Sequence, residues 1–188
     1  GIPGKLTKAA KRTLSKFVLD FFRINPLIYD GQPLFDASHG NLGAAALSAA
    51  SVAAARAAMQ KQRMFGSDDP AGINPRTLLV PFDLEETGVN VFRRGTNDDK
   101  TFVQSLSLDV VPVWYWSDTT DWVVAADPAE TPIIEVGFLD GNDEPELFVQ
   151  DLPSGGSLFS HDQLTWKIRH IYGGVPVEYR GVYKSVVI

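Results

Sequence analysis

The residues of this chain with the widest catalytic repertoire are its three histidines, His39, His161 and His170. A histidine can act as a general base or bind a metal only together with partners at a suitable spacing. None of the three lies in a metal-binding pattern such as His-Glu-x-x-His. Ser38, His161 and an aspartate could form a nucleophilic triad, but no Gly-x-Ser-x-Gly elbow supports it. The histidines therefore predict neither a metal site nor a hydrolase.

Paired acids and paired glycines have ordinary structural explanations. The acid pairs fall at a predicted helix start and in turns: Glu85-Glu86, Asp68-Asp69 and Asp98-Asp99. The acidic run from Asp140 to Glu144 does not have the register of a calcium-binding helix-loop-helix, so we expect a turn. Neither Gly155-Gly156 nor Gly173-Gly174 precedes the lysine of a phosphate-binding loop. We predict no catalytic residue, no metal ligand and no cofactor.

The cluster Trp114-Tyr115-Trp116 is a candidate binding surface. Aromatic residues favour strands whatever their function, so the cluster is also explained by a strand that contributes large side chains to the core. Aromatic residues are equally common as anchors where subunits pack together. Pro112 predicts an edge strand, because proline cannot donate a ladder hydrogen bond. The sequence leaves core and contact surface open as alternatives.

Length and composition indicate a globular protein. The 188 residues are 44% hydrophobic and 21% charged, which suits one domain, or one domain with an extension. The sequence contains no run of about 18 apolar residues, so no transmembrane helix is predicted. The absence of cysteine excludes disulfides and thiol nucleophiles, and it fits a reducing compartment. Because the chain opens on Gly1 and not on methionine, we expect a processed product or part of a longer protein.

Charge is distributed unevenly along the chain. The formal net charge is −6, yet residues 1–30 hold six lysines and arginines against Asp20 and Asp30. The rest of the chain is therefore about ten charges negative. Such an acidic body argues against a dedicated nucleic-acid binder, whose phosphate contacts need a basic surface. We expect only the N-terminal segment to face a polyanion.

The first predicted helix is amphipathic and basic, and runs from Leu6 to Ile24. Its apolar side is formed by Leu14, Phe17, Val18 and Phe21. Such a helix could bind a membrane or a partner, but most helices of this kind lay their apolar side on their own core. Pro26 ends the helix, and residues 26–43 have the Pro, Gly, Asp and Asn content of a loop.

An alanine-rich helix is predicted from Ala44 to about Arg63. Ten alanines lie between Ala44 and Ala58, and alanine combines the highest helix propensity with little bulk. Such a helix can approach a sheet closely, with Val52 and Met59 as larger anchors. We expect it to pack on a central sheet.

A buried strand over Thr77–Val80 and a helix over Asp83–Arg94 come next. Asp83 is predicted to be the N-cap, with Glu85 and Glu86 in the first turn. The predicted buried face consists of Leu84, Val91 and Phe92, and the predicted end consists of Arg93, Arg94 and Gly95. We expect this helix to pack on the same sheet.

Everything beyond about Phe102 is predicted to be β-structure. The predicted strands are Val110–Trp114, Trp122–Ala126, Ile133–Leu139, Leu147–Val149, Leu164–Arg169, and a strand pair or one bent strand over Val175–Val187. The turn Asp140–Asp143 predicts a hairpin between two of them. Helices come first and strands later, so the predicted class is α+β, with helices on a mixed or antiparallel sheet and a β-rich C-terminal half.

A set of short pieces follows a recognisable order from about residue 8 to the end. The pieces are Asn25-Pro26, Tyr29-Asp30-Gly31, Leu34-Phe35, His39-Gly40-Asn41-Leu42, Ala57-Ala58-Met59, Ile73-Asn74-Pro75, Leu79-Val80-Pro81, Leu84-Glu85, Trp122, Ala126-Asp127-Pro128, Phe138-Leu139-Asp140-Gly141, Pro145, Asp162, Lys167, Arg169, Tyr179-Arg180-Gly181 and Tyr183-Lys184. In order and spacing they resemble the C-terminal part of phage and prophage major capsid proteins with the Hong Kong 97-type fold. The closest resemblance is to the Mu-like major head subunits.

The resemblance implies a structural protein that self-assembles through pentamers and hexamers into an icosahedral shell. The protein would belong to the virion and assemble in the host cytoplasm. Residues 1–43 would be a basic helix and loop of the peripheral domain, and residues 44–188 the axial domain with returning peripheral strands. The implied partners are other copies of the chain, with a portal, a scaffold or a prohead protease as further candidates. Packaged DNA would be contacted only non-specifically, and no membrane is implied.

The same resemblance limits what this chain is expected to do by itself. The family's N-terminal arm and extended hairpin would lie upstream of it, so we expect a monomer or a weak ring. Two alternatives stay open. One is a hydrolase or lyase of unknown type, for which no coherent residue set is visible. The other is a β-rich tail or baseplate binding module that uses Trp114–Trp116.

Overall fold

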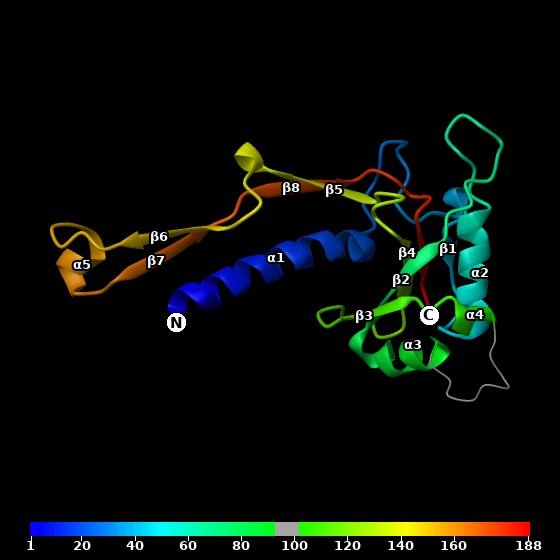
Figure 1. The fold of residues 1–188 in the computed structure, drawn as a ribbon, viewed down its shortest axis with the longest axis horizontal. Helices are drawn as coiled ribbons and strands as arrows, with labels where there is room; N and C mark the ends of the chain where they lie inside the picture. Colours follow the sequence, from blue (N-terminus) through cyan, green and yellow to red (C-terminus); the bar gives the residue numbers. More distant parts are fainter. Residues whose placement is uncertain (93–101) are drawn as a thin grey trace. The chain divides into compact units, whose positions relative to one another are not determined.

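The computed structural model describes residues 1–92 and 102–188 and divides the chain into two compact units. The first, here called the arm unit, contains Gly1–Asp20 and Val136–Val175; the second, the sheet unit, contains Phe21–Glu135 and Pro176–Ile188. Helices and strands of both units are drawn in Figure 1. The chain is α+β, as the sequence predicts.

The predicted basic helix is α1, and it spans Ile2–Ile24. It begins four residues earlier than expected. The four residues of its predicted apolar side are half-buried, while its buried residue is Phe22. Asn25, with a φ of 53°, ends the helix just before Pro26, and its N–H donates to the Phe21 carbonyl. The predicted C-terminus of this helix is confirmed.

The sheet unit is built on a five-stranded mixed sheet in the order β1-β9-β4-β2-β3. The strands are β1 (Leu42–Gly43), β9 (Val182–Ser185), β4 (Trp122–Ala126), β2 (Pro75–Pro81) and β3 (Asp109–Val113). The pairs β1–β9 and β2–β3 are parallel, and the other two pairs are antiparallel. The predicted strands β2, β3 and β4 are confirmed. β3 lies at the edge of the sheet, as Pro112 predicts.

Helices and the central strands share one hydrophobic core. The helices are α2 (Ala49–Gln60), α3 (Glu85–Phe92) and α4 (Phe102–Ser105). Val52 and Met59 of α2 are buried in the same cluster as Leu78 and Trp122, which confirms the predicted anchors and the packing on the sheet. The Trp122 indole N–H donates to the Ala45 carbonyl at 2.9 Å. α3, which corresponds to the helix predicted over Asp83–Arg94, packs there through Phe92.

The opposite face of the sheet is also covered. Leu79, Val123 and Lys184 are cross-strand neighbours, and alternation along the strands directs them away from the helix face. Lys184 lines a cavity together with Phe22, so the end of α1 lies against this second face. Leu34 and Phe35, in the loop after α1, are fully buried. Both faces of the sheet are therefore shielded from water.

The alanine-rich helix starts later than predicted. α2 begins at Ala49, because Ser48 is its N-cap and forms a capping box with Ser51. These side-chain hydrogen bonds to the backbone outweigh the helix propensity of the preceding alanines. Residues 44–48 are therefore not helical, although Leu47 still reaches the core.

Asp83 does not cap the next helix. It lies inside a short 3₁₀ turn, η2 (Phe82–Leu84), and α3 continues from Glu85. Glu85 and Glu86 occupy the first turn of α3, as predicted. Gly88 allows α3 to approach the sheet, because a Cβ atom there would lie 3.2 Å from Val110. Arg93, Arg94 and Gly95, the predicted end of this helix, lie outside the described residues.

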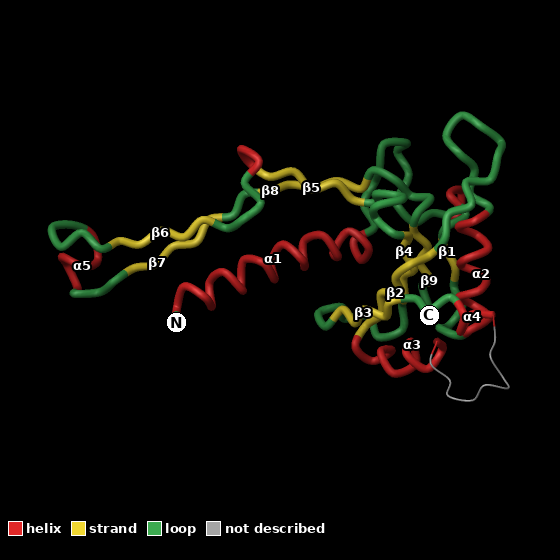
Figure 2. The backbone as a smooth tube through the Cα atoms, in the orientation of Figure 1, coloured by secondary structure: helices red, strands yellow, loops and turns green. Residues whose placement is uncertain are grey.

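The strands of the arm unit form two consecutive ladders, drawn in yellow in Figure 2. β5 (Ile134–Phe138) pairs with β8 (Tyr172–Pro176), and β6 (Glu146–Gln150) pairs antiparallel with β7 (Thr165–Arg169). A short helix, α5 (Gly156–His161), lies in the connection between β6 and β7. The burial pattern of β7 alternates between exposed and half-buried residues, as in a strand with one side facing solvent.

The predicted hairpin at Asp140–Asp143 is wrong, although the turn itself is present. Asp140 and Gly141 have φ values of 55° and 70° within the short turn η4 (Leu139–Gly141). The chain then continues into β6, which pairs with β7 and not with β5. Turn-forming residues act locally, whereas a strand's partner depends on distant residues, so the turn alone could not identify the pairing.

The last predicted segment forms two separate strands. β8 pairs with β5, whereas β9 lies between β1 and β4 in the five-stranded sheet. Val175–Val187 is therefore neither one bent strand nor a pair of mutual partners. Among the helices of residues 1–92 and 102–188, none combines the length and apolarity needed to cross a membrane.

Candidate functional site

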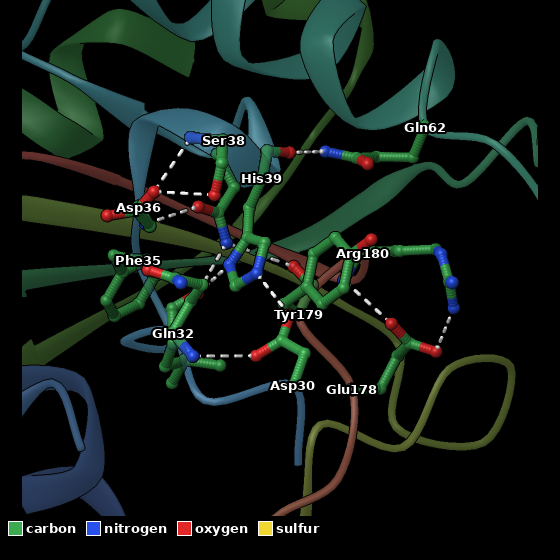
Figure 3. A network of polar contacts seen from close by, with 12 residues as sticks. Asp30, Gln32, Phe35, Asp36, Ser38, His39, Gln62, Glu178, Tyr179 and Arg180 are labelled. Atoms are coloured by element: carbon green, nitrogen blue, oxygen red, sulfur yellow. Dashed lines mark hydrogen bonds and ion pairs between the residues drawn. The ribbon is translucent and has the colours of Figure 1, made fainter. Parts of the chain in front are cut away.

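The densest polar network of the sheet unit surrounds His39 (Figure 3). It joins the loop after α1 to Gln62 and to the segment Glu178–Arg180. Asp36 starts the local structure, because its carboxylate accepts from the Ser38 N–H at 2.8 Å and from the Ser38 hydroxyl at 2.6 Å. A 3₁₀ turn, η1 (Ala37–His39), follows, and Gly40 ends it with a φ of 64°. This turn carries His39 into the interior.

His39 is only 7% exposed and contacts residues of the loop after α1 and of the segment before β9. Its Nε2 atom lies 2.7 Å from an Asp30 carboxylate oxygen, and its Nδ1 atom lies 3.3 Å from the Leu34 carbonyl oxygen. Its ring stacks on Tyr179 at 4.0 Å with an interplanar angle of 9°. Both polar partners are acceptors, so both contacts are hydrogen bonds only when both ring nitrogens carry protons. Through these contacts His39 connects the loop after α1 to the segment before β9.

Two asparagine side chains complete this arrangement. Asn25 exchanges two hydrogen bonds with the Phe35 backbone, at 2.7 and 3.0 Å. Asn41, which is 1% exposed, donates to the Leu34 and Tyr179 carbonyls and accepts from the Asp36 N–H. An amide can donate and accept at once, which lets each side chain substitute for a missing backbone partner. The loop is thus held by these side chains as well as by its own backbone contacts, which include the bridge between Leu27 and Pro33.

Electrostatics around the network favour charged carboxylates. The Gln32 N–H, and then the hydrogen bond with His39, hold the pKa of Asp30 below its usual range. The hydroxyl and N–H of Ser38 lower the pKa of Asp36 in the same way. Burial, and then the nearby Glu178 charge, raise the pKa of the Tyr29 phenol. The network therefore stabilises the charged carboxylates of the loop.

The Ser38–His161–aspartate triad, which the sequence does not favour, would combine residues of two different units. Ser38 lies in the sheet unit and donates to Asp36, whereas His161 lies in the arm unit with its Nδ1 atom 2.6 Å from the Ser160 hydroxyl. His170 stacks on Phe138 in the arm unit. Within residues 1–92 and 102–188, no group of three or more His, Cys, Asp or Glu side chains could hold a metal ion.

The other polar motifs have structural positions. Asp68-Asp69 lies in a loop and Asp140–Glu144 in a turn region, as predicted, while Asp98-Asp99 lies outside the described residues. Gly155 is the N-cap of α5, and Gly173-Gly174 belongs to β8. The structure gives each of the described motifs a role in the backbone.

The aromatic cluster is not part of a core strand. β3 ends at Val113, and Trp114 and Tyr115 form the turn that follows it. Trp114 is 60% exposed, while Tyr115 and Trp116 are half-buried. The predicted explanation as strand residues filling the core is therefore wrong for Trp114, and a contact surface remains.

One buried ion pair could not be predicted from the sequence. Lys184 and Asp121 lie 3.1 Å apart, and their side chains are only 12% and 10% exposed. They line a cavity of about 150 Å³ together with Phe22 and Trp116. Nearby, the backbone N–H groups of Thr120 and Asp121 lower the pKa of Asp118. Alternation in β9 shows which way Lys184 points, but nothing local identifies its partner.

The sequence profile of a family described as phage capsid protein matches residues 2–185, which is nearly the whole chain. No curated protein sequence matches the chain.

Proposed function

This chain belongs to the phage capsid protein family, and from that premise we propose that it is a major head subunit that self-assembles into an icosahedral shell. Its role is structural, and its place is the virion capsid. The finer proposal is that it has the Hong Kong 97-type fold and is closest to the Mu-like head subunits. The single observation that carries the proposal is a capsid-family match that covers both the arm unit and the sheet unit.

The two units support a division of labour. We assign the axial domain to the sheet unit and the peripheral domain to the beginning of α1 together with the returning strands β5 to β8. In support, Gly1–Asp20 and Val136–Val175 group together although they are far apart in sequence. Residues 21–43, which the sequence assigned to the peripheral domain, group with the sheet unit.

The proposed partners follow from the same role. Copies of the chain would meet as pentamers and hexamers, with portal, scaffold and prohead protease as further partners and packaged DNA contacted non-specifically. Assembly would take place in the cytoplasm of the host bacterium. The basic residues of α1, including Lys5 and Lys8, are the surface we assign to DNA, because the rest of the chain is acidic.

The test compares the chain by itself with its complete open reading frame. Light scattering and electron microscopy should show closed shells from the complete open reading frame, and a monomer or weakly associating ring from this chain. Isolated ring contacts are expected to be modest, because buried area has to offset the lost freedom of association. A complete product that stays monomeric at high concentration would contradict the proposed function.

A further inference from the structure

The sheet unit carries two surface patches, each built around at least one exposed aromatic ring. The Phe65 patch consists of Tyr29, Met64, Phe65 and Arg180. The Trp114 patch consists of Trp114, Tyr115 and Trp116. Tyrosine, tryptophan, methionine and arginine are the residue types enriched where proteins contact one another.

The Phe65 patch combines exposed rings with a cation. Phe65 is 84% exposed and Tyr29 is 60% exposed. The Arg180 guanidinium lies 5.9 Å from the centre of the Phe65 ring and 5.0 Å from that of Tyr179. Glu178 holds the guanidinium in place at 2.7 Å. The Arg180 side chain is itself only 13% exposed, so the patch presents the rings of Phe65 and Tyr29 to a partner.

The loop that presents Phe65 is held by its own contacts. The Met64 N–H donates to the Asp69 carbonyl at 3.0 Å, and Arg63 forms an isolated β-bridge with Pro70. Arg63 also pairs with the Asp68 carboxylate. Phe65 is therefore presented on a closed turn, so little conformational freedom remains to be lost when a partner binds.

The Trp114 patch lies elsewhere on the same unit. Trp114 is 60% exposed, and its ring meets Tyr115 edge-on at 5.2 Å. Figure 1 shows the turn after β3 and the loop after α2 on opposite sides of the sheet unit. Two different surfaces on opposite sides suit a head-to-tail contact, in which each copy uses one surface for each neighbour.

The size of the patches favours a weak contact repeated in a ring. Each patch offers on the order of a few hundred Å² of apolar surface, whereas a stable pair needs about 800 Å² per partner. A head-to-tail contact of this size would be weak between two copies. In a closed ring every copy makes this contact twice, once with each neighbour. A closed ring is therefore stable where an isolated pair of copies is not.

We propose that the Trp114 patch of one copy binds the Phe65 patch of a second copy, with the Trp114 ring against the exposed Phe65 ring. The assignment rests on the proposed capsid function and deepens it by naming the two surfaces of the ring contact.

Cysteine cross-linking tests the assignment, because the natural chain contains no cysteine. Ser67→Cys and Ser117→Cys place thiols beside the two patches at exposed positions without removing an anchor. The two single variants are mixed at high concentration and oxidised, and the same substitutions are made in the complete open reading frame. Thr87→Cys, exposed on α3, is the control partner for each.

The expected product is the mixed 67–117 dimer, in clear excess over every pair that contains residue 87. Adding Phe65→Ala to the Ser67→Cys chain, or Trp114→Ala to the Ser117→Cys chain, should lower its yield about tenfold, the loss expected for a contact anchor. Phe102→Ala, which truncates an exposed ring on α4, should leave the yield unchanged. Melting curves confirm that each variant folds.

Three outcomes would overturn the assignment. A predominance of 67–67 or 117–117 dimers would indicate a two-fold contact. Shells that form from the complete open reading frame without a 67–117 product would remove the assignment and leave the proposed function intact. If the complete open reading frame neither assembles nor cross-links, both the patch assignment and the proposed capsid function are contradicted.

Discussion

The arm unit and the sheet unit are stabilised in different ways. All the buried side chains among the described residues belong to the sheet unit, whose central sheet is covered on both faces. The arm unit relies on ladder hydrogen bonds, exposed ion pairs such as Arg169–Glu146, and ring contacts such as Phe17–Tyr172. Two-stranded ribbons are marginal by themselves. The comparison teaches that the stability of the chain resides in the sheet unit.

The largest expected effect is the loss of the central aromatic of the sheet unit. Trp122 is 1% exposed, and Trp122→Ala should lower the free energy of unfolding by about 3–5 kcal/mol because it leaves a large cavity. The matched variant Trp114→Ala removes a ring that is 60% exposed and should change it by less than about 0.5 kcal/mol. Denaturant unfolding measures both. Equal losses would contradict the assignment of the core.

A smaller effect is expected where α2 approaches the sheet. Ala55 is fully buried, so Ala55→Leu should overpack the contact and lower the free energy of unfolding by about 1–3 kcal/mol. Ala54 is exposed on the same helix, so Ala54→Leu should be nearly neutral. Thermal melts of the two variants give the comparison. If Ala55→Leu melts like the parent, the helix does not approach the sheet as closely as described.

Acid should weaken the loop that holds His39. The pKa of Asp30 is lowered in the folded state by the Gln32 N–H and by His39, so its contribution to stability is present above the unfolded-state pKa of about 4 and is lost as the pH falls. The melting temperature should therefore fall as the pH drops below about 4, and less steeply in Asp30→Asn. Asp83→Asn, an exposed carboxylate in η2, is the substitution control. Parallel pH profiles for Asp30→Asn and the parent would contradict the role of this contact.

The smallest effect is expected in the arm. Leu147 is 39% exposed on β6, so Leu147→Ala should change the unfolding of the sheet unit by no more than about 0.5 kcal/mol. Hydrogen exchange should nevertheless be faster at amides of β6 and β7 than at amides of β2 and β4, because no buried core protects the arm. Equal protection in the two regions would show that the arm unit is as stable as the sheet unit.

Much of the fold could be predicted because its signals are local. The basic helix, the anchors Val52 and Met59, and the strands β2 and β4 follow from side-chain periodicity, and the edge position of β3 follows from Pro112. The predictions failed in two ways. In one, a local side-chain contact overrode a predicted helix start, and in the other, a strand paired with a segment other than its predicted neighbour. The Ser48 capping box shortened α2, and the Asp140 turn led into a strand with a partner other than the predicted one.

The candidate site was only partly visible in the sequence. The pieces that resemble capsid proteins include His39, Asn41 and Tyr179, but they do not reveal how these residues meet. The stack of His39 on Tyr179 joins positions about 140 residues apart, and the pair Asp121–Lys184 joins the residue before β4 to the end of β9. No periodicity encodes such contacts.

The sequence by itself determined the α+β class, the uneven distribution of charge, the main helices and strands, and the resemblance to capsid proteins. Only the tertiary structure decided that β5 pairs with β8, that Trp114 lies exposed after an edge strand, and that His39 locks a loop to the segment before β9. The physical reason is the distance along the sequence over which each kind of interaction acts. Propensity, caps and turns act over a few residues, whereas strand partners and buried polar contacts depend on which distant surfaces exclude water together.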